Sequence, residues 1–244
     1  MQNHGLDRRQ FIRYSLLAAG YSLTAGSSLL APLVNALGKV PKKLADDESI
    51  FTLSGKVSVD GKKATESTII TPNSTIETQS SGNLIFVVGK DAHILRENSK
   101  VVLSQDASSL EAGLQLTKGK VLSVFGKRRS GEGNMNISTT TATIGIRGTG
   151  VYSESFDDHS YVCTCYGTTA IASNRDGSSQ EVVTTQHHDS PRDILKDGKK
   201  GSLIEPAPMK NLTDEELMLI EALVGREPPF SSLIQYNSPR RGYE

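Results

Sequence analysis

The chain has 244 residues, with 27 acidic and 27 basic side chains, so its formal charge at pH 7 is zero. Binding to the phosphate backbone needs a basic surplus, so this balance argues against nucleic acid as a partner. Tryptophan is absent and aromatic residues make up 5% of the chain. The core must therefore consist of Ile, Val, Leu and Ala, which suits many short, closely stacked strands. The length suits one domain with extensions, or two small domains.

The amino-terminal region has the features of a targeting segment. Residues 7–13 read Asp-Arg-Arg-Gln-Phe-Ile-Arg, and a weakly hydrophobic stretch follows over residues 14–37. This arrangement resembles a twin-arginine export signal, with Arg8 and Arg9 as the paired arginines. The resemblance implies export of the folded protein to the periplasm and cleavage that removes a signal peptide at 1–36. Because the stretch is about 20 residues long, a retained inner-membrane anchor facing the periplasm is the alternative, and it is the one route by which the chain would contact a membrane.

After a linker at 37–48, short apolar runs alternate with turn signals at intervals of roughly 8 to 12 residues, which is typical of an all-β protein. We expect a β-solenoid-like or β-roll stack of short strands, in which each rung pairs with the next. A β-sandwich is the alternative. The expected strands are 56–59, 67–70, 83–88, 92–95, 100–103, 110–117 and 120–125, and a turn at Lys118 and Gly119 is expected between the last two.

Three motifs resemble the FecR domain family. They are the charged turn of Asp91–Ser99, the segment Leu114–Gly126, and Thr139–Thr149, which reads T-x-T-A-T-x-G-x-R-G-T. The resemblance covers a domain at 49–155 and implies a periplasmic, non-enzymatic protein that binds a ligand or an envelope protein. In the family, such domains relay an outer-membrane signal to a regulator of a sigma factor. The sequence identifies neither the ligand nor the partner. It contains no Gly-x-Ser-x-Gly or His-Glu-x-x-His motif of a hydrolase.

The third motif also has a physical interpretation. Its glycines permit a bulge between Ile144 and Val151. The guanidinium of Arg147 is expected to cap backbone carbonyls where the chain bends. Binding of an anionic ligand by Arg147 is the alternative role.

The two cysteines of the chain, Cys163 and Cys165, are one residue apart. In a strand both thiols lie on one face, with Cα atoms about 6.6 Å apart, close to the limit for a disulfide. The same geometry suits two thiolates that bind one soft metal ion, such as copper or zinc. A disulfide or redox pair and two reduced core residues are the alternatives.

The adjacent His187 and His188 are the best candidates for a further metal ligand. Side chains of neighbouring residues diverge in an extended segment, so one of the two is expected to bind. The weaker candidates are His159, Met135 and Met209. Within a β extension at 156–205, a meander of three short strands would bring the histidines close to the cysteine strand. The expected strands of this meander are 160–166, 169–173 and 181–186, with turns at Gly167 and 174–177.

The carboxyl-terminal region, 206–244, contains the clearest helix signal. Thr213 is a good N-cap, Glu216 completes a capping box, and Gly225 ends the pattern. We expect this helix to cap an open end of the strand stack. A helix that binds a partner protein is the alternative.

Overall fold

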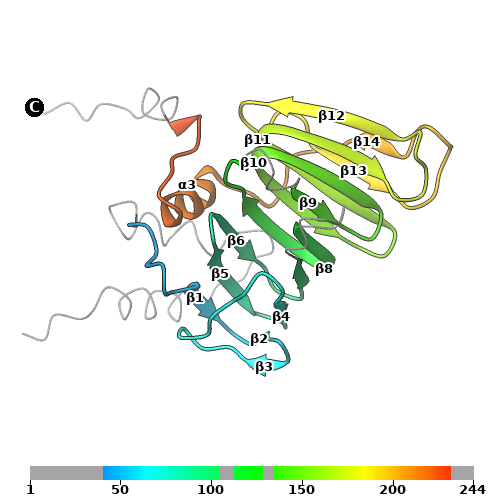
Figure 1. The fold of residues 1–244 in the computed structure, drawn as a ribbon. Coiled ribbons are helices and arrows are strands. Elements are labelled where there is room, and N and C mark those ends of the chain that lie inside the picture. Colours follow the sequence, from blue (N-terminus) through cyan, green and yellow to red (C-terminus); the bar gives the residue numbers. More distant parts are fainter. Residues whose placement is uncertain (1–40, 105–112, 129–134, 232–244) are drawn as a thin grey trace, which may run out of the picture.

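The computed structural model describes residues 41–104, 113–128 and 135–231, which contain a 14-stranded sheet and the helix α3, Asp214–Leu223 (Figure 1). The all-β class with a carboxyl-terminal helix is confirmed for these residues. In chain order the strands are β1 (Ile50–Ser54), β2 (Val57–Val59), β3 (Lys62–Lys63), β4 (Thr75–Thr78), β5 (Asn83–Val88), β6 (Asp91–Leu95), β7 (Lys100–Ser104), β8 (Gly113–Val124), β9 (Met135–Ser138), β10 (Ala142–Ser155), β11 (His159–Ser173), β12 (Gln180–Thr185), β13 (Arg192–Leu195) and β14 (Ile204–Pro206).

Strand β8 organises the sheet because its two halves pair with different neighbours. Residues 113–118 pair with β7, and residues 119–124 pair with β10. Strand β9 pairs with both β8 and β10, so these three strands close a circuit. The β8–β9 pair is parallel, and every other pairing among the described strands is antiparallel. The predicted solenoid-like stack is not confirmed, because the strands form antiparallel ribbons. All the described strands belong to one hydrogen-bonded sheet, and the alternative of a β-sandwich is not confirmed either.

Two predicted turns and one predicted strand are wrong. The chain continues in the strand conformation through Gly119 in β8 and Gly167 in β11, with φ of 90° and 87°. Glycine adopts such positive φ angles without strain, so each residue allows a local irregularity and the strand continues. Residues 67–70 form no strand. The hydroxyl of Thr68 instead accepts a hydrogen bond from the backbone N–H of Thr65 at 2.9 Å, which favours a local turn.

Alternate residues of the central strands contribute to two different cores, because successive side chains of a strand point to opposite faces. One face of β8, β10 and β11 contributes Val121, Val151 and Val162 to the first core. The other face contributes Leu122, Tyr152 and Cys163 to the second core, which also contains Leu217, Ile220 and Leu223 of α3. The helix therefore covers one face of the sheet, in contact with β6 and β8, rather than closing the end of a stack of strands (Figure 1).

The beginning of α3 follows its local sequence. The hydroxyl of Thr213 accepts a hydrogen bond from the Glu216 N–H at 3.3 Å, and the Glu216 carboxylate accepts one from the Thr213 N–H at 3.1 Å. The predicted capping box is thus confirmed. Both interactions satisfy backbone donors that the first helical turn would otherwise leave unpaired.

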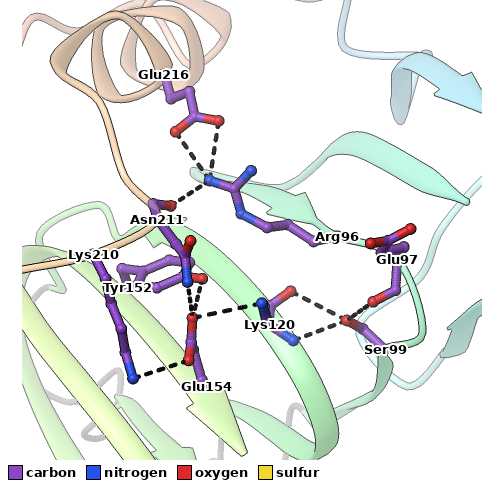
Figure 2. A network of polar contacts seen from close by, with 9 residues as sticks. All are labelled: Arg96, Glu97, Ser99, Lys120, Tyr152, Glu154, Lys210, Asn211 and Glu216. Carbon is purple, nitrogen blue, oxygen red and sulfur yellow. Dashed lines mark hydrogen bonds and ion pairs between the residues drawn. The ribbon is translucent and has the colours of Figure 1, made fainter. Parts of the chain in front are cut away.

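A polar network, called here the helix clasp, attaches the start of α3 to the sheet (Figure 2). One nitrogen of the Arg96 guanidinium donates to both carboxylate oxygens of Glu216, at 3.1 and 3.0 Å, and to the backbone oxygen of Asn211 at 2.6 Å. The buried Glu154 of β10 accepts from Tyr152 Oη at 2.6 Å and from Asn211 Nδ2 at 2.8 Å. Buried carboxylates are stable only when paired, so the clasp fixes where α3 begins.

Candidate Cys–His site

Cys163 and Cys165 lie in the middle of β11, on the face that α3 covers. Both side chains are 0% exposed and both thiols are free. Cys163 lies opposite Tyr152 of β10 in the strand register, and Val162 points into the other core. The predicted arrangement of two thiols on one face of a strand is therefore present.

A tight turn after β12 brings a histidine to these thiols. The backbone N–H of His188 donates to the carbonyl oxygen of Cys165 at 3.0 Å. His188 has a φ of 51°, and the hydroxyl of Thr185 accepts a hydrogen bond from the His187 N–H at 3.1 Å. As a result His188 is 5% exposed, whereas His187 lies on the surface. One ligand atom each from Cys163, Cys165 and His188 lie within 4.8 Å of one another.

Asp214, the first residue of α3, holds both imidazoles. Its Oδ1 atom is 2.8 Å from Nε2 of His187 and 3.0 Å from Nε2 of His188. The other ring nitrogen of His188, Nδ1, is buried and has no hydrogen-bond partner among the described residues. In metal sites, a histidine ligand commonly donates the N–H of one ring nitrogen to a carboxylate. This hydrogen bond fixes the orientation of the ring, so that the other nitrogen faces the metal ion.

The pKa values in the Cys–His group favour the thiolate form of one of the two cysteines. The pKa of Cys163 is lowered to about 6, chiefly by a hydrogen bond from Cys165 and further by His188. The pKa of Cys165 is raised, first by burial and then by the neighbouring Cys163. Burial acts to lower the pKa of His188, but the interactions with Cys163 and Asp214 outweigh it and raise this pKa. Cys163 is therefore the first of the two thiols to ionise.

Aromatic side chains enclose the site. The Phe230 ring packs against both imidazoles, with centroids 4.6 Å from His187 and 5.8 Å from His188. Phe230 also lines a cleft of about 730 Å³ together with Tyr166.

The glycine-rich motif shapes this same region. The register of β10 against β11 shifts on both sides of Gly150, which confirms the predicted bulge. A Cβ atom at Gly150 would lie 2.6 Å from a ring carbon of Tyr166 and 3.2 Å from a methyl group of Leu217. The motif thus permits close approach of β10, the Tyr166 ring and α3.

The remaining predicted residues lie elsewhere. Arg147 is exposed in β10 opposite Thr168 of β11, and among the described residues no backbone carbonyl accepts a hydrogen bond from its guanidinium. His159 hydrogen-bonds the Asp158 carboxylate at 2.7 Å and is not part of the Cys–His group. Met135 packs against the first core and Met209 is exposed. Arg8 and Arg9 lie outside the described residues.

Asp214 is the residue of the candidate site that the sequence did not indicate. Its position in the first turn of a helix was sufficient to explain an acidic side chain. No spacing rule connects it to His187 and His188, which precede it by 27 and 26 residues.

Comparisons with known proteins agree with the expected family. The profile of the FecR protein family matches residues 78–168, less than half of the chain but a segment that includes both cysteines. No curated protein matches the sequence significantly. Two crystal structures of a proposed anti-sigma factor from Parabacteroides distasonis resemble the fold with a TM-score of 0.45 and 9% identity, over 56% of this chain and 60% of that chain. The part of this chain that aligns therefore spans 60% of the length of that protein.

The FecR match extends from the last residue of β4 into β11. Within the described residues, no helix combines the length and apolar character needed to cross a membrane.

Proposed function

We propose that this chain is an exported, non-enzymatic regulatory protein of the FecR type that works in the periplasm. In this proposal it binds a soft metal ion, copper or zinc, through Cys163, Cys165 and His188 and relays the bound state to an envelope protein. The FecR match supports the regulatory part. The observation that supports the metal-binding part is the meeting of two buried thiols with a buried imidazole that Asp214 holds by its Nε2 atom.

The donor atoms fit such an ion. Thiolates and imidazoles are the ligands that copper and zinc prefer in proteins. Asp214 supplies the hydrogen bond that fixes the tautomer of His188, because an Nε2–H that donates to the carboxylate leaves the Nδ1 lone pair free. Two cysteines that only fill space would not need the direct interaction of Cys163 with His188 or the support of this imidazole by Asp214.

Metal analysis of the full chain tests the proposal. Protein purified from the periplasm should contain about one equivalent of copper or zinc by mass spectrometry, and Cys163→Ser and His188→Gln should remove it. His187→Gln is the matched control, because His187 also contacts Asp214 but lies outside the thiol group. Two titratable thiols without metal in the wild-type protein would contradict the metal site and leave a redox pair as the second candidate.

Export and signalling have separate tests. Replacement of Arg8 and Arg9 by lysine should retain the protein in the cytoplasm in cell fractionation, since the paired arginines are the recognition element of the route. Secretion that does not depend on this pair would contradict twin-arginine export. A regulatory role predicts that metal-dependent changes in transcript levels disappear in cells that carry Cys163→Ser.

A further inference from the structure

In the described part of the chain, the Cys–His group consists of three candidate ligands, Cys163, Cys165 and His188. Among the described residues, no other His, Cys, Asp or Glu joins Cys163, Cys165 and His188 within 4.8 Å. The Oδ1 atom of Asp214 is engaged by both imidazoles, at 2.8 Å from His187 Nε2 and 3.0 Å from His188 Nε2. The described His, Cys, Asp and Glu side chains therefore offer two sulfurs and one nitrogen.

Water is a poor fourth ligand at this place. The two thiols are 0% exposed and lie in the apolar core beneath α3. A buried water needs two to four polar partners. Three tyrosines of the same core donate their hydroxyl protons to other groups, Tyr152 to Glu154, Tyr161 to the backbone oxygen of Pro208 and Tyr166 to Glu221, so none of these protons is directed at the thiols.

These two facts separate zinc from copper. Protein-bound Zn²⁺ is almost always tetrahedral and takes four ligands, or three ligands and a water. Cu⁺ is softer, is selected by thiolates, and is stable with three ligands in a plane. Zn²⁺ would neutralise both thiolates whereas Cu⁺ neutralises one, but that advantage does not supply the missing ligand.

We propose that the site selects copper(I), bound by Cys163 Sγ, Cys165 Sγ and His188 Nδ1 in a dry, three-coordinate centre. This inference rests on the metal-binding function proposed above and specifies its ligand. In this proposal the protein binds copper(I), and Asp214 positions His188 without binding the ion.

Competition titrations of the full chain under anaerobic, reducing conditions test the selectivity. The probes are Cu⁺ with bicinchoninate as the competing chelator, and Zn²⁺ with a chromogenic zinc chelator. One equivalent of Cu⁺ should bind, at least about a thousandfold more tightly than Zn²⁺. Cys163→Ser, Cys165→Ser and His188→Gln should each weaken Cu⁺ binding by about a hundredfold or more, and His187→Gln should not. X-ray absorption of the copper-loaded protein should show two sulfur ligands and one nitrogen ligand.

The outcomes distinguish the two proposals. If Zn²⁺ binds more tightly than Cu⁺ and needs the same three residues, or if absorption shows a fourth ligand, copper(I) selectivity is overturned and the metal-binding function stands. If neither ion binds stoichiometrically, both are overturned. Circular dichroism of each variant checks that it folds, and a Cys165→Ser variant that folds and still binds Cu⁺ with wild-type affinity also overturns the three-ligand assignment.

Discussion

Replacement of Arg96 by methionine should destabilise the fold by about 3 kcal/mol, the lower end of the 3–5 kcal/mol that follows removal of one partner from a buried ion pair. The side chains of Arg96 and Glu216 are 15% and 0% exposed, and one guanidinium nitrogen lies within 3.1 Å of both carboxylate oxygens. Without Arg96 the carboxylate remains buried but still accepts the Thr213 N–H at 3.1 Å. This remaining hydrogen bond is the reason to expect the lower value.

Urea unfolding monitored by tyrosine fluorescence measures this change, since the chain has seven tyrosines and no tryptophan. The double variant Arg96→Met/Glu216→Gln should recover at least about 1 kcal/mol relative to Arg96→Met, because it removes both buried charges and keeps an acceptor for the capping box. Lys43→Met, which breaks an exposed ion pair with Asp46, is the control and should cost less than about 1 kcal/mol. The reasoning fails if Arg96→Met resembles this control, or if the double variant is no more stable than the single one.

Three further predictions concern the motif and the site. Gly150→Ala should cost about 1–3 kcal/mol in the same assay, because its Cβ would overlap a tyrosine ring; Gly177→Ala, with no atom within 4 Å of the added Cβ, should be neutral, and equal losses would refute the packing argument. In the metal-free protein, thiolate absorbance at 240 nm should rise near pH 6 and this step should be absent in Cys163→Ser, because the pKa of Cys163 is lowered to about 6 from 9.0, first by Cys165. A lowered pKa in the folded state means that the stability contributed by this thiolate is fully present above pH 9 and is lost as the pH falls through 6; a first step above pH 8 would contradict the assignment. Asp214→Ala should weaken metal binding about 10–100-fold in a competition titration, whereas Glu215→Ala, which removes the same charge from the same helical turn, should leave it unchanged, and equal effects would mean that only the helix dipole matters.

Local signals were sufficient to predict α3. A hydroxyl at Thr213, a carboxylate three residues later and a glycine after the last turn each act within a few residues, so their effect does not depend on the rest of the fold. Short strands such as β5 and β6 were predicted for the same reason, because their apolar runs end at glycine and asparagine turns.

The long strands were not predictable in this way. Gly119 and Gly167 carry the same local signal as the turn glycines, yet β8 and β11 continue through them. The difference comes from pairing partners that are distant in sequence. Strand β7 pairs with the first half of β8 and β10 with the second half, and β10 also pairs with nearly the whole of β11. Tertiary pairing thus overrides the turn tendency of a single glycine.

The candidate site depends on both kinds of information. The spacing of Cys163 and Cys165 predicted a shared face, and any strand conformation provides it. The contribution of His188 rather than His187 depends on one backbone hydrogen bond, from His188 to the Cys165 carbonyl, and on a residue with positive φ. A pattern in the sequence does not encode that choice, because two adjacent histidines differ only in which one the turn buries.

The candidate ligands come from two parts of the chain. Both thiols lie within residues 78–168, the part that matches the FecR family, whereas His188 and Asp214 come from the chain that follows. The thiols alone would therefore be an incomplete site, and a bound ion would join the FecR-like sheet to the turn after β12 and, through Asp214, to the first residue of α3. The helix clasp holds the same end of α3 through Glu216. Ion binding should therefore stabilise the docking of α3 on the sheet, and docking of α3 should strengthen ion binding by the same factor, because coupling between two equilibria is reciprocal. In the proposed function, the metal ion therefore controls the order of one surface, which is formed by α3 and the turn after β12. A partner that senses the bound state should contact this surface.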